Sequence, residues 1–112
     1  MIKIILASKS KVRKEILDTN NVNSQVQPSN VDEDAIKESL LKNGATPETI
    51  SKELAQLKAN KVSQNYQNDL VLGADSVIDL EGELISKPEN RKEALNILKK
   101  LNGKKHHLIS SV

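Results

Sequence analysis

The chain has 112 residues, 17 basic against 15 acidic side chains, and a formal net charge of +2. This length accommodates one domain, and a charge so near neutrality gives no indication of a nucleic-acid or membrane surface. The absence of cysteine excludes disulfides, thiolate metal sites and cysteine nucleophiles. Tyr66 is the only aromatic residue, so the core must consist of aliphatic side chains, and base-stacking aromatic platforms are disfavoured. No run of about 18 apolar residues occurs, and we expect a cytoplasmic protein without a membrane span.

The first elements are predicted to be a strand, a turn, a helix and a second strand. Residues 2–7 are rich in β-branched and aliphatic side chains, which favours a strand, and a polar turn at residues 8–10 follows. Alternation of apolar and polar residues over 22–28, ending in Pro28, predicts a second strand at the edge of a sheet. Between the turn and this strand, the apolar side of the predicted helix is formed by Val12, Ile16 and Leu17.

Two helices are predicted next. Asp32 is an N-cap type of residue at the start of the first helix, and Asn43-Gly44 is its stop signal. Thr46 and Pro47 open the second helix as its N-cap and first helical residue, and we expect this helix to end near Asn65. Its inward side is predicted to contain Ile50, Leu54, Leu57 and Val62, with Lys58 at four-residue spacing between Leu54 and Val62.

The remaining elements are three short strands, a helix and a final strand. Residues 70–74 favour a buried strand, and residues 76–80 and 83–85 favour a hairpin. An amphipathic helix is predicted over residues 90–101, and a further strand begins at residue 108. The inward side of the helix is predicted to contain Ala94, Leu95, Leu98 and Leu101.

This element order predicts the α/β class, with a mixed β-sheet flanked by helices in one domain over residues 1–112. The chain stops inside a predicted strand, without a turn or polar tail after Val112. We therefore expect it to be the N-terminal part of a longer protein.

The first candidate site is the turn that contains Ser8, Ser10 and Arg13. Free backbone N–H groups at a helix N-terminus, two hydroxyls and a guanidinium together would form a cradle for phosphate. Basic residues are otherwise unfavourable at the positive end of a helix, and a bound anion would reverse that balance. The alternative is that Ser10 only caps the helix while the neighbouring lysines are solvated.

Four further positions have a functional and an ordinary interpretation. Asp75 follows an apolar strand, at the place where α/β sheets carry functional groups. Glu33 lies in a row of three acids at a helix start, where acids also occur simply as caps. Lys58 either extends from the helix edge into solvent or reaches a phosphate in the cleft. Pro88 holds Lys87 in an extended conformation, which either aims its ammonium or leaves an ordinary exposed lysine.

Together these fragments resemble the Maf (septum formation inhibitor) family of nucleoside triphosphate pyrophosphatases. The resemblance covers residues 4–112, and its strength is that six short fragments occur in the family's order at fitting intervals. The fragments are Leu6-Ala7-Ser8-Lys9-Ser10-Lys11-Val12-Arg13 with Glu15-Ile16-Leu17, Val31-Asp32-Glu33, Leu54-Ala55-Gln56-Leu57-Lys58-Ala59, Gly73-Ala74-Asp75-Ser76, Gly82-Glu83 with Lys87-Pro88, and Leu101-Asn102-Gly103 before His106-His107.

The resemblance implies a cytoplasmic hydrolase that cleaves nucleoside triphosphates, modified or non-canonical ones included, between the α and β phosphates. The products would be the monophosphate and pyrophosphate, with Mg²⁺ or Mn²⁺ as cofactor. Asp75 matches the family's proton acceptor, and the metal would be held by Asp75 and Glu33. The resemblance also implies a homodimer without a membrane or nucleic-acid partner. The residues that match phosphate-binding positions are Ser8, Ser10, Arg13, Lys58 and Lys87.

Two departures from the family pattern bear on substrate choice. The family's common Pro-Arg in the first motif is Lys11-Val12 here, and the usual Thr after the catalytic Asp is Ser76. In the branch that resembles dTTP and UTP hydrolases these positions are linked to base selection, so Val12 and Ser76 are candidate specificity residues. Family members also continue into a second half. The alternatives are therefore a non-catalytic nucleotide- or nucleic-acid-binding module that kept the phosphate loop, and a piece that is only partly folded by itself.

Overall fold

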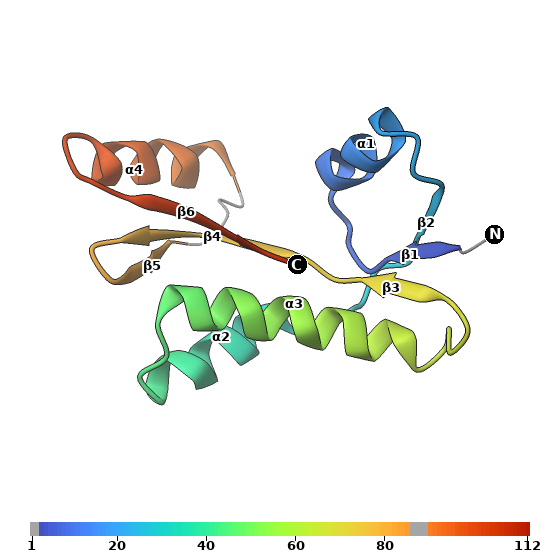
Figure 1. Ribbon diagram of the computed structural model, residues 1–112. Helices are drawn as coiled ribbons and strands as arrows, with labels where there is room; N and C mark the ends of the chain where they lie inside the picture. Colours follow the sequence, from blue (N-terminus) through green and yellow to red (C-terminus); the bar gives the residue numbers. More distant parts are fainter. Residues whose placement is uncertain (1–2, 86–89) are drawn as a thin grey trace.

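The computed structural model describes residues 3–85 and 90–112 of the chain (Figure 1). Within these residues, four helices and six strands follow one another in the predicted order, and the α/β class is confirmed. Every element lies within a few residues of its predicted position. The elements are β1 (Ile4–Leu6), α1 (Lys11–Thr19), β2 (Ser24–Val26), α2 (Glu33–Lys42), α3 (Pro47–Ser63), β3 (Leu70–Leu72), β4 (Asp75–Leu80), β5 (Glu83–Ile85), α4 (Arg91–Leu101) and β6 (His107–Ser111).

The described helices begin where a side chain can accept the otherwise unpaired backbone N–H groups of the first turn. Three of the four caps are the residues that the sequence indicates as helix starts. The N-cap side chains are those of Ser10, Asp32, Thr46 and Asn90, and each accepts from the backbone N–H three residues later. Local sequence therefore determines where these helices begin, α1 at the first candidate site included.

The strands are divided between two sheets of three instead of joining in one mixed sheet. The parallel sheet has the order β2-β1-β3, with β2 at its edge as predicted, and the antiparallel sheet has the order β5-β4-β6. Residues 73–74 connect β3 directly to β4, so the chain passes from one sheet into the other at this point (Figure 1). Helix α3 packs against β3, β4 and β6, and it thereby holds the two sheets together.

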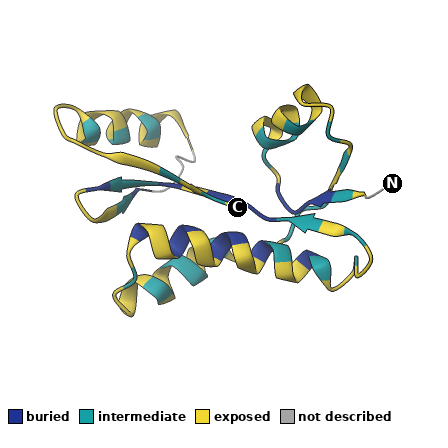
Figure 2. Cartoon of the chain, viewed as in Figure 1, coloured by how far each residue is buried: buried dark blue, intermediate teal, exposed yellow. Residues whose placement is uncertain are grey.

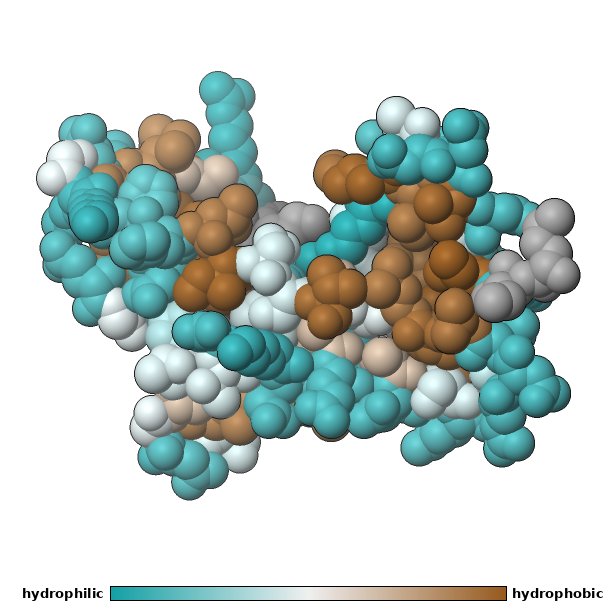
Figure 3. Space-filling view, viewed as in Figure 1, coloured by the Kyte–Doolittle hydropathy of each residue, from teal (hydrophilic) through white to brown (hydrophobic). Residues whose placement is uncertain are grey.

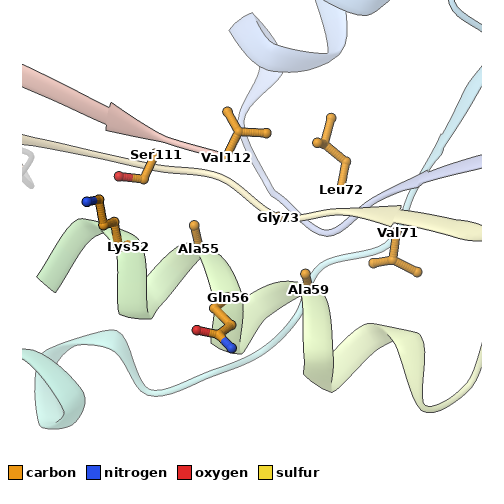
Figure 4. Close-up of a pocket in the computed structure, with 9 residues that line it drawn as sticks. All are labelled: Lys52, Ala55, Gln56, Ala59, Val71, Leu72, Gly73, Ser111 and Val112. Atoms are coloured by element: carbon orange, nitrogen blue, oxygen red, sulfur yellow. The ribbon is translucent and has the colours of Figure 1, made fainter. Parts of the chain in front are cut away.

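Gly73 marks the place where the strand approaches α3 most closely. A Cβ atom at this position would lie 2.2 Å from the carbonyl oxygen of Ala55 and 2.9 Å from the Cβ of Ala59. Figure 4 shows both alanines directed from α3 toward the strand at Gly73. The absence of a side chain at Gly73 allows this contact, which sets the position of Asp75 two residues later.

The core lies between α3 and the two sheets (Figure 2). Leu57 was predicted to face inward, and this is wrong, because it lies at the edge of the buried side of α3 and is 37% exposed. No described helix is long and apolar enough to cross a membrane. The largest buried aliphatic side chains are Ile5, Leu6, Ile50, Leu54 and Val77.

The apolar sides of α1 and α4 are largely exposed, which contradicts their predicted inward orientation. Val12 is 63% and Ile16 55% exposed on α1, and Leu95 is 52% and Leu98 65% exposed on α4. The reason is that no element among the described residues packs closely over these two surfaces (Figure 2). Figure 3 likewise shows apolar side chains open to solvent beneath α1 and beside α4.

Candidate functional site

A cleft of about 1120 Å³ lies between the 8–13 turn, the start of α2, and the start of β4. This volume is sufficient for a small organic ligand of nucleotide size. All of the described residues that the sequence indicates as site candidates line this cleft, whereas Lys87 lies outside the described residues. The candidates that the structure brings together are Ser8, Ser10, Val12, Arg13, Glu33, Lys58, Asp75 and Ser76.

Hydrogen bonds between its own side chains shape the turn at one end of the cleft. The hydroxyl of Ser10 accepts from the backbone N–H of Arg13 at 3.2 Å, so Ser10 caps α1. Ser8 Oγ accepts from the Ser10 backbone N–H at 3.1 Å and from Arg13 Nη1 at 3.0 Å. The guanidinium of Arg13 is therefore held over the turn, beside the N-terminus of α1.

Arg13 also connects this turn to the antiparallel sheet. Its Nη2 lies 3.4 Å from the hydroxyl of Ser76, the residue that follows Asp75 on β4. Ser76 in turn exchanges a hydrogen bond of 2.9 Å with Ser110 on the neighbouring strand β6. Arg13, a candidate phosphate-binding residue, and Ser76, a candidate specificity residue, are thus in contact although they are 63 residues apart in the sequence.

A second group of charged side chains surrounds the ammonium of Lys58. Its Nζ lies 2.5 Å from Glu33 Oε1, 3.3 Å from Asp75 Oδ1 and 3.2 Å from the backbone carbonyl oxygen of Ala74. The side chains of Lys58 and Asp75 are each only 8% exposed, whereas that of Glu33 is 40% exposed. The lysine does not extend into solvent; it joins two carboxylates from different elements.

The acidic row at the start of α2 divides into two roles. Asp32 is the cap, because its Oδ1 accepts from the backbone N–H of Ala35 at 3.2 Å. Glu33, one residue later, turns toward Lys58 instead. The capping interpretation therefore holds for Asp32, whereas Glu33 forms an ion pair with Lys58.

Asp75 is buried, and one of its carboxylate oxygens is unpaired. Oδ1 faces Lys58, whereas Oδ2 has no hydrogen-bond partner among the described residues although it is inaccessible to solvent. The backbone of Asp75 is fixed from α3, since Ser51 Oγ donates to its carbonyl oxygen at 3.2 Å. A buried, unpaired carboxylate oxygen is costly and is therefore characteristic of a site that takes up a proton, a water or a cation.

Sequence reasoning missed Ser51 and Ser110. Ser51 precedes Lys58 by seven residues and shares the buried side of α3 with it, so a small polar residue in that apolar row was a usable signal. Ser110 gives no such signal, because its contact with Ser76 depends on the pairing of β4 with β6.

The donor set partly fits a hard divalent cation. Glu33 Oε1 and Asp75 Oδ1, which both contact the ammonium of Lys58, are carboxylate oxygens of the kind that Mg²⁺ and Mn²⁺ prefer. Within the described residues, however, no group of three acidic or histidine side chains is gathered in one place. Protein ligands alone would therefore give an incomplete shell, which phosphate oxygens and water would have to complete.

The family of Maf-like proteins matches residues 3–112 of this chain. The chain belongs to the Maf family. The nucleoside triphosphate pyrophosphatase of Pelagibacter ubique (strain HTCC1062) is 68% identical over 109 residues, which are 97% of this chain and 56% of that protein. The nucleoside triphosphate pyrophosphatase of Ruegeria sp. (strain TM1040) is 45% identical, over 96% of this chain and 54% of its own length.

A relative with a narrower name is also similar. The dTTP/UTP pyrophosphatase of Dictyoglomus thermophilum is 38% identical over 97% of this chain and 54% of its own length. The chain thus spans about half the length of the curated relatives that it matches.

Proposed function

We propose that this chain carries the phosphate-binding and catalytic groups of a nucleoside triphosphate pyrophosphatase. The substrate class is canonical, modified or non-canonical (d)NTPs, and the products are the nucleoside monophosphate and pyrophosphate. The observation that carries the proposal is the convergence of Arg13, Lys58, Glu33 and Asp75 on one cleft. The names of the Pelagibacter and Ruegeria relatives support it.

The cationic groups would act on the polyphosphate. A nucleoside triphosphate carries close to four negative charges, and stabilising the charge that develops on the leaving pyrophosphate is the main catalytic requirement. Arg13, Ser8, Ser10 and the backbone N–H groups that begin α1 would bind phosphate oxygens at one end of the cleft. We assign Lys87 to the same task from the family resemblance alone.

Asp75 would act as the proton acceptor for the attacking water. Its Oδ2 is the oxygen that no described group occupies, so this oxygen is the one that would accept the proton. Glu33 and Asp75 would hold a divalent metal, which when bound would neutralise charge on the polyphosphate. Ser51 fixes the Asp75 backbone and thereby the direction of the carboxylate.

The test is pyrophosphate release from a panel of canonical and modified triphosphates, dTTP and UTP included, with Mg²⁺ or Mn²⁺. Asp75→Asn removes the base without changing its size, and the rate should fall about 10²- to 10⁴-fold. Asp79→Asn is the matched control, because Asp79 lies on the same strand and accepts from the Gly82 backbone N–H at 2.7 Å, outside the cleft.

Three outcomes discriminate between the interpretations. Loss of activity in Asp75→Asn with an active Asp79→Asn supports the assignment. Full activity of Asp75→Asn refutes it. Tight triphosphate binding with no pyrophosphate release from the unaltered chain would instead support the second candidate, a non-catalytic nucleotide-binding module.

The proposed function extends to the nucleobase preference, the oligomeric state and the cellular compartment of the protein. Val12 lies exposed on the cleft wall and Ser76 beside Arg13, so we propose that both influence which base is accepted. Swapping Ser76→Thr should change the order of preference within the panel. We also propose a cytoplasmic homodimer, from the resemblance, and sedimentation of the purified chain measures its assembly.

A further inference from the structure

The ammonium of Lys58 is itself the cation that lies between the carboxylates of Glu33 and Asp75. An ammonium group has three N–H donors, and three acceptors surround this one: Glu33 Oε1, Asp75 Oδ1 and the carbonyl oxygen of Ala74. No donor of this group is therefore left for a phosphate oxygen. Since the side chain is 8% exposed, little water competes for these bonds.

The two carboxylates that Lys58 joins are also the carboxylates best placed to ligate a divalent metal. Glu33 and Asp75 come from α2 and β4, and the lysine bridges them from α3. The single positive charge of Lys58 offsets only one of the two negative charges of Glu33 and Asp75. A divalent cation in its place would balance both. The ammonium and the divalent cation repel each other strongly when both are close to the same oxygens in a poorly hydrated place.

We propose that Lys58 is the resident counter-cation of the Glu33–Asp75 pair and that a divalent metal displaces it into the cleft. The three N–H groups of the displaced ammonium become free to bind the polyphosphate. Metal binding and substrate binding are therefore coupled through this side chain. The proposal rests on the proposed function for its substrate. The displacement of Lys58 by a metal involves only residues of this chain, and it can be measured without turnover of a substrate.

The first test is a titration of the metal-free chain with Mn²⁺ alone, followed by electron paramagnetic resonance. Lys58→Met keeps much of the aliphatic stem and removes the competing charge, so its Mn²⁺ dissociation constant should fall at least tenfold. Lys52→Met is the matched control: Lys52 is on the same helix and pairs with Glu48 Oε1 at 3.1 Å on the exposed side. It removes one positive charge as well and should leave the constant unchanged.

Unchanged or weaker Mn²⁺ binding by a folded Lys58→Met would overturn the proposal, because it would make Lys58 a support for the metal ligands and not their competitor. Absence of Mn²⁺ binding by both the unaltered chain and Lys58→Met would also overturn it. Lys58→Arg keeps the charge and should not bind Mn²⁺ more tightly than the unaltered chain.

A second measurement needs no variant, and it decides the matter if Lys58→Met does not fold. The unaltered chain is acetylated with and without saturating Mn²⁺, and modification of each lysine is measured by mass spectrometry. Lys58 should be protected without metal and several-fold more reactive with it, whereas Lys52 should react equally in both. Continued protection of Lys58 at saturating Mn²⁺ refutes displacement. Displacement without any pyrophosphate release would refute only the proposed function.

Discussion

Replacing Gly73 with alanine should force apart the helix and the strand that together position Asp75. The new Cβ would lie 2.2 Å from the carbonyl oxygen of Ala55 and 2.8 Å from the backbone nitrogen of Ala59. A carbon and a carbonyl oxygen in contact normally lie about 3.3 Å apart, so α3 and the strand must separate by roughly 1 Å. Both obstacles are backbone atoms of a helix, and no change of rotamer relieves them.

The cost follows from the lost packing between α3 and the sheets. Overpacking a close contact typically lowers the free energy of unfolding by about 1–3 kcal/mol. For a domain of this size, that corresponds to a fall of about 4–15 °C in Tm, measured by thermal unfolding followed by circular dichroism. Because Asp75 lies two residues beyond Gly73, Mn²⁺ binding should weaken as well.

Two comparisons separate this steric cause from a general effect of losing a glycine. Gly44 has φ +79° and open space around it, so Gly44→Ala should cost about 1–2 kcal/mol of backbone strain without altering Mn²⁺ affinity. Adding Ala59→Gly to Gly73→Ala removes the methyl group at 2.9 Å but not the Ala55 carbonyl. Full recovery of Tm in that double variant, or an unchanged Tm in Gly73→Ala alone, would refute the reasoning.

Two hydroxyl substitutions test the supports of the site. Ser51→Ala leaves the buried Asp75 carbonyl without its donor and should lower the free energy of unfolding by about 1–3 kcal/mol in urea. Ser63→Ala, which removes an exposed hydrogen bond to Asn60, should change it far less, and an equal loss would contradict this. Ser110→Ala should weaken triphosphate binding several-fold in calorimetry with little change in Tm, because exposed Ser110 steadies Ser76 beside Arg13. Unaltered affinity would remove Ser110 from the site.

The helix boundaries could be predicted because short-range chemistry determines them. Asp32 and Thr46 cap the helices that they were expected to cap, and Pro47 stands at the first helical position. Gly82 has φ +91° in the two-residue turn of the hairpin, as its place after Glu81 indicates. Each of these features depends on a few neighbouring residues, so no knowledge of the tertiary structure is needed.

The division into two sheets could not be predicted, since it depends on contacts between distant residues. Residues 70–74 and 76–80 were expected as successive strands of one sheet, and nothing local shows that their sheets differ. Gly73 lies where the chain passes from one sheet into the other, and its lack of a side chain allows the close approach to α3 at that point. A glycine at the end of an apolar strand indicates such an approach only once its partner helix is known.

Sequence patterns indicated the residues of the candidate site but not the contacts that they make with one another. The spacing of Lys58 between Leu54 and Val62 left two interpretations open, and the structure places this side chain on the buried side of α3. Asp75 was expected as a functional group after an apolar strand, and the structure adds that it is buried. The expectation that Lys58 faces a phosphate did not include the two carboxylates around it. Their convergence needs α2, α3 and β4 to be placed together, which no sequence window contains.

The exposed apolar sides of α1 and α4 are a second feature that sequence patterns could not predict. Hydrophobic periodicity indicates which side of a helix is apolar, but it does not indicate what covers that side. Here Val12, Ile16, Ile97 and Leu108 line the cleft that also contains the charged groups. The cleft therefore has an apolar wall beside a polar one, an arrangement that suits a ligand with an uncharged ring system and a polyanionic tail. A nucleotide, the substrate class proposed above, has these two parts, whereas inorganic phosphate lacks the ring system.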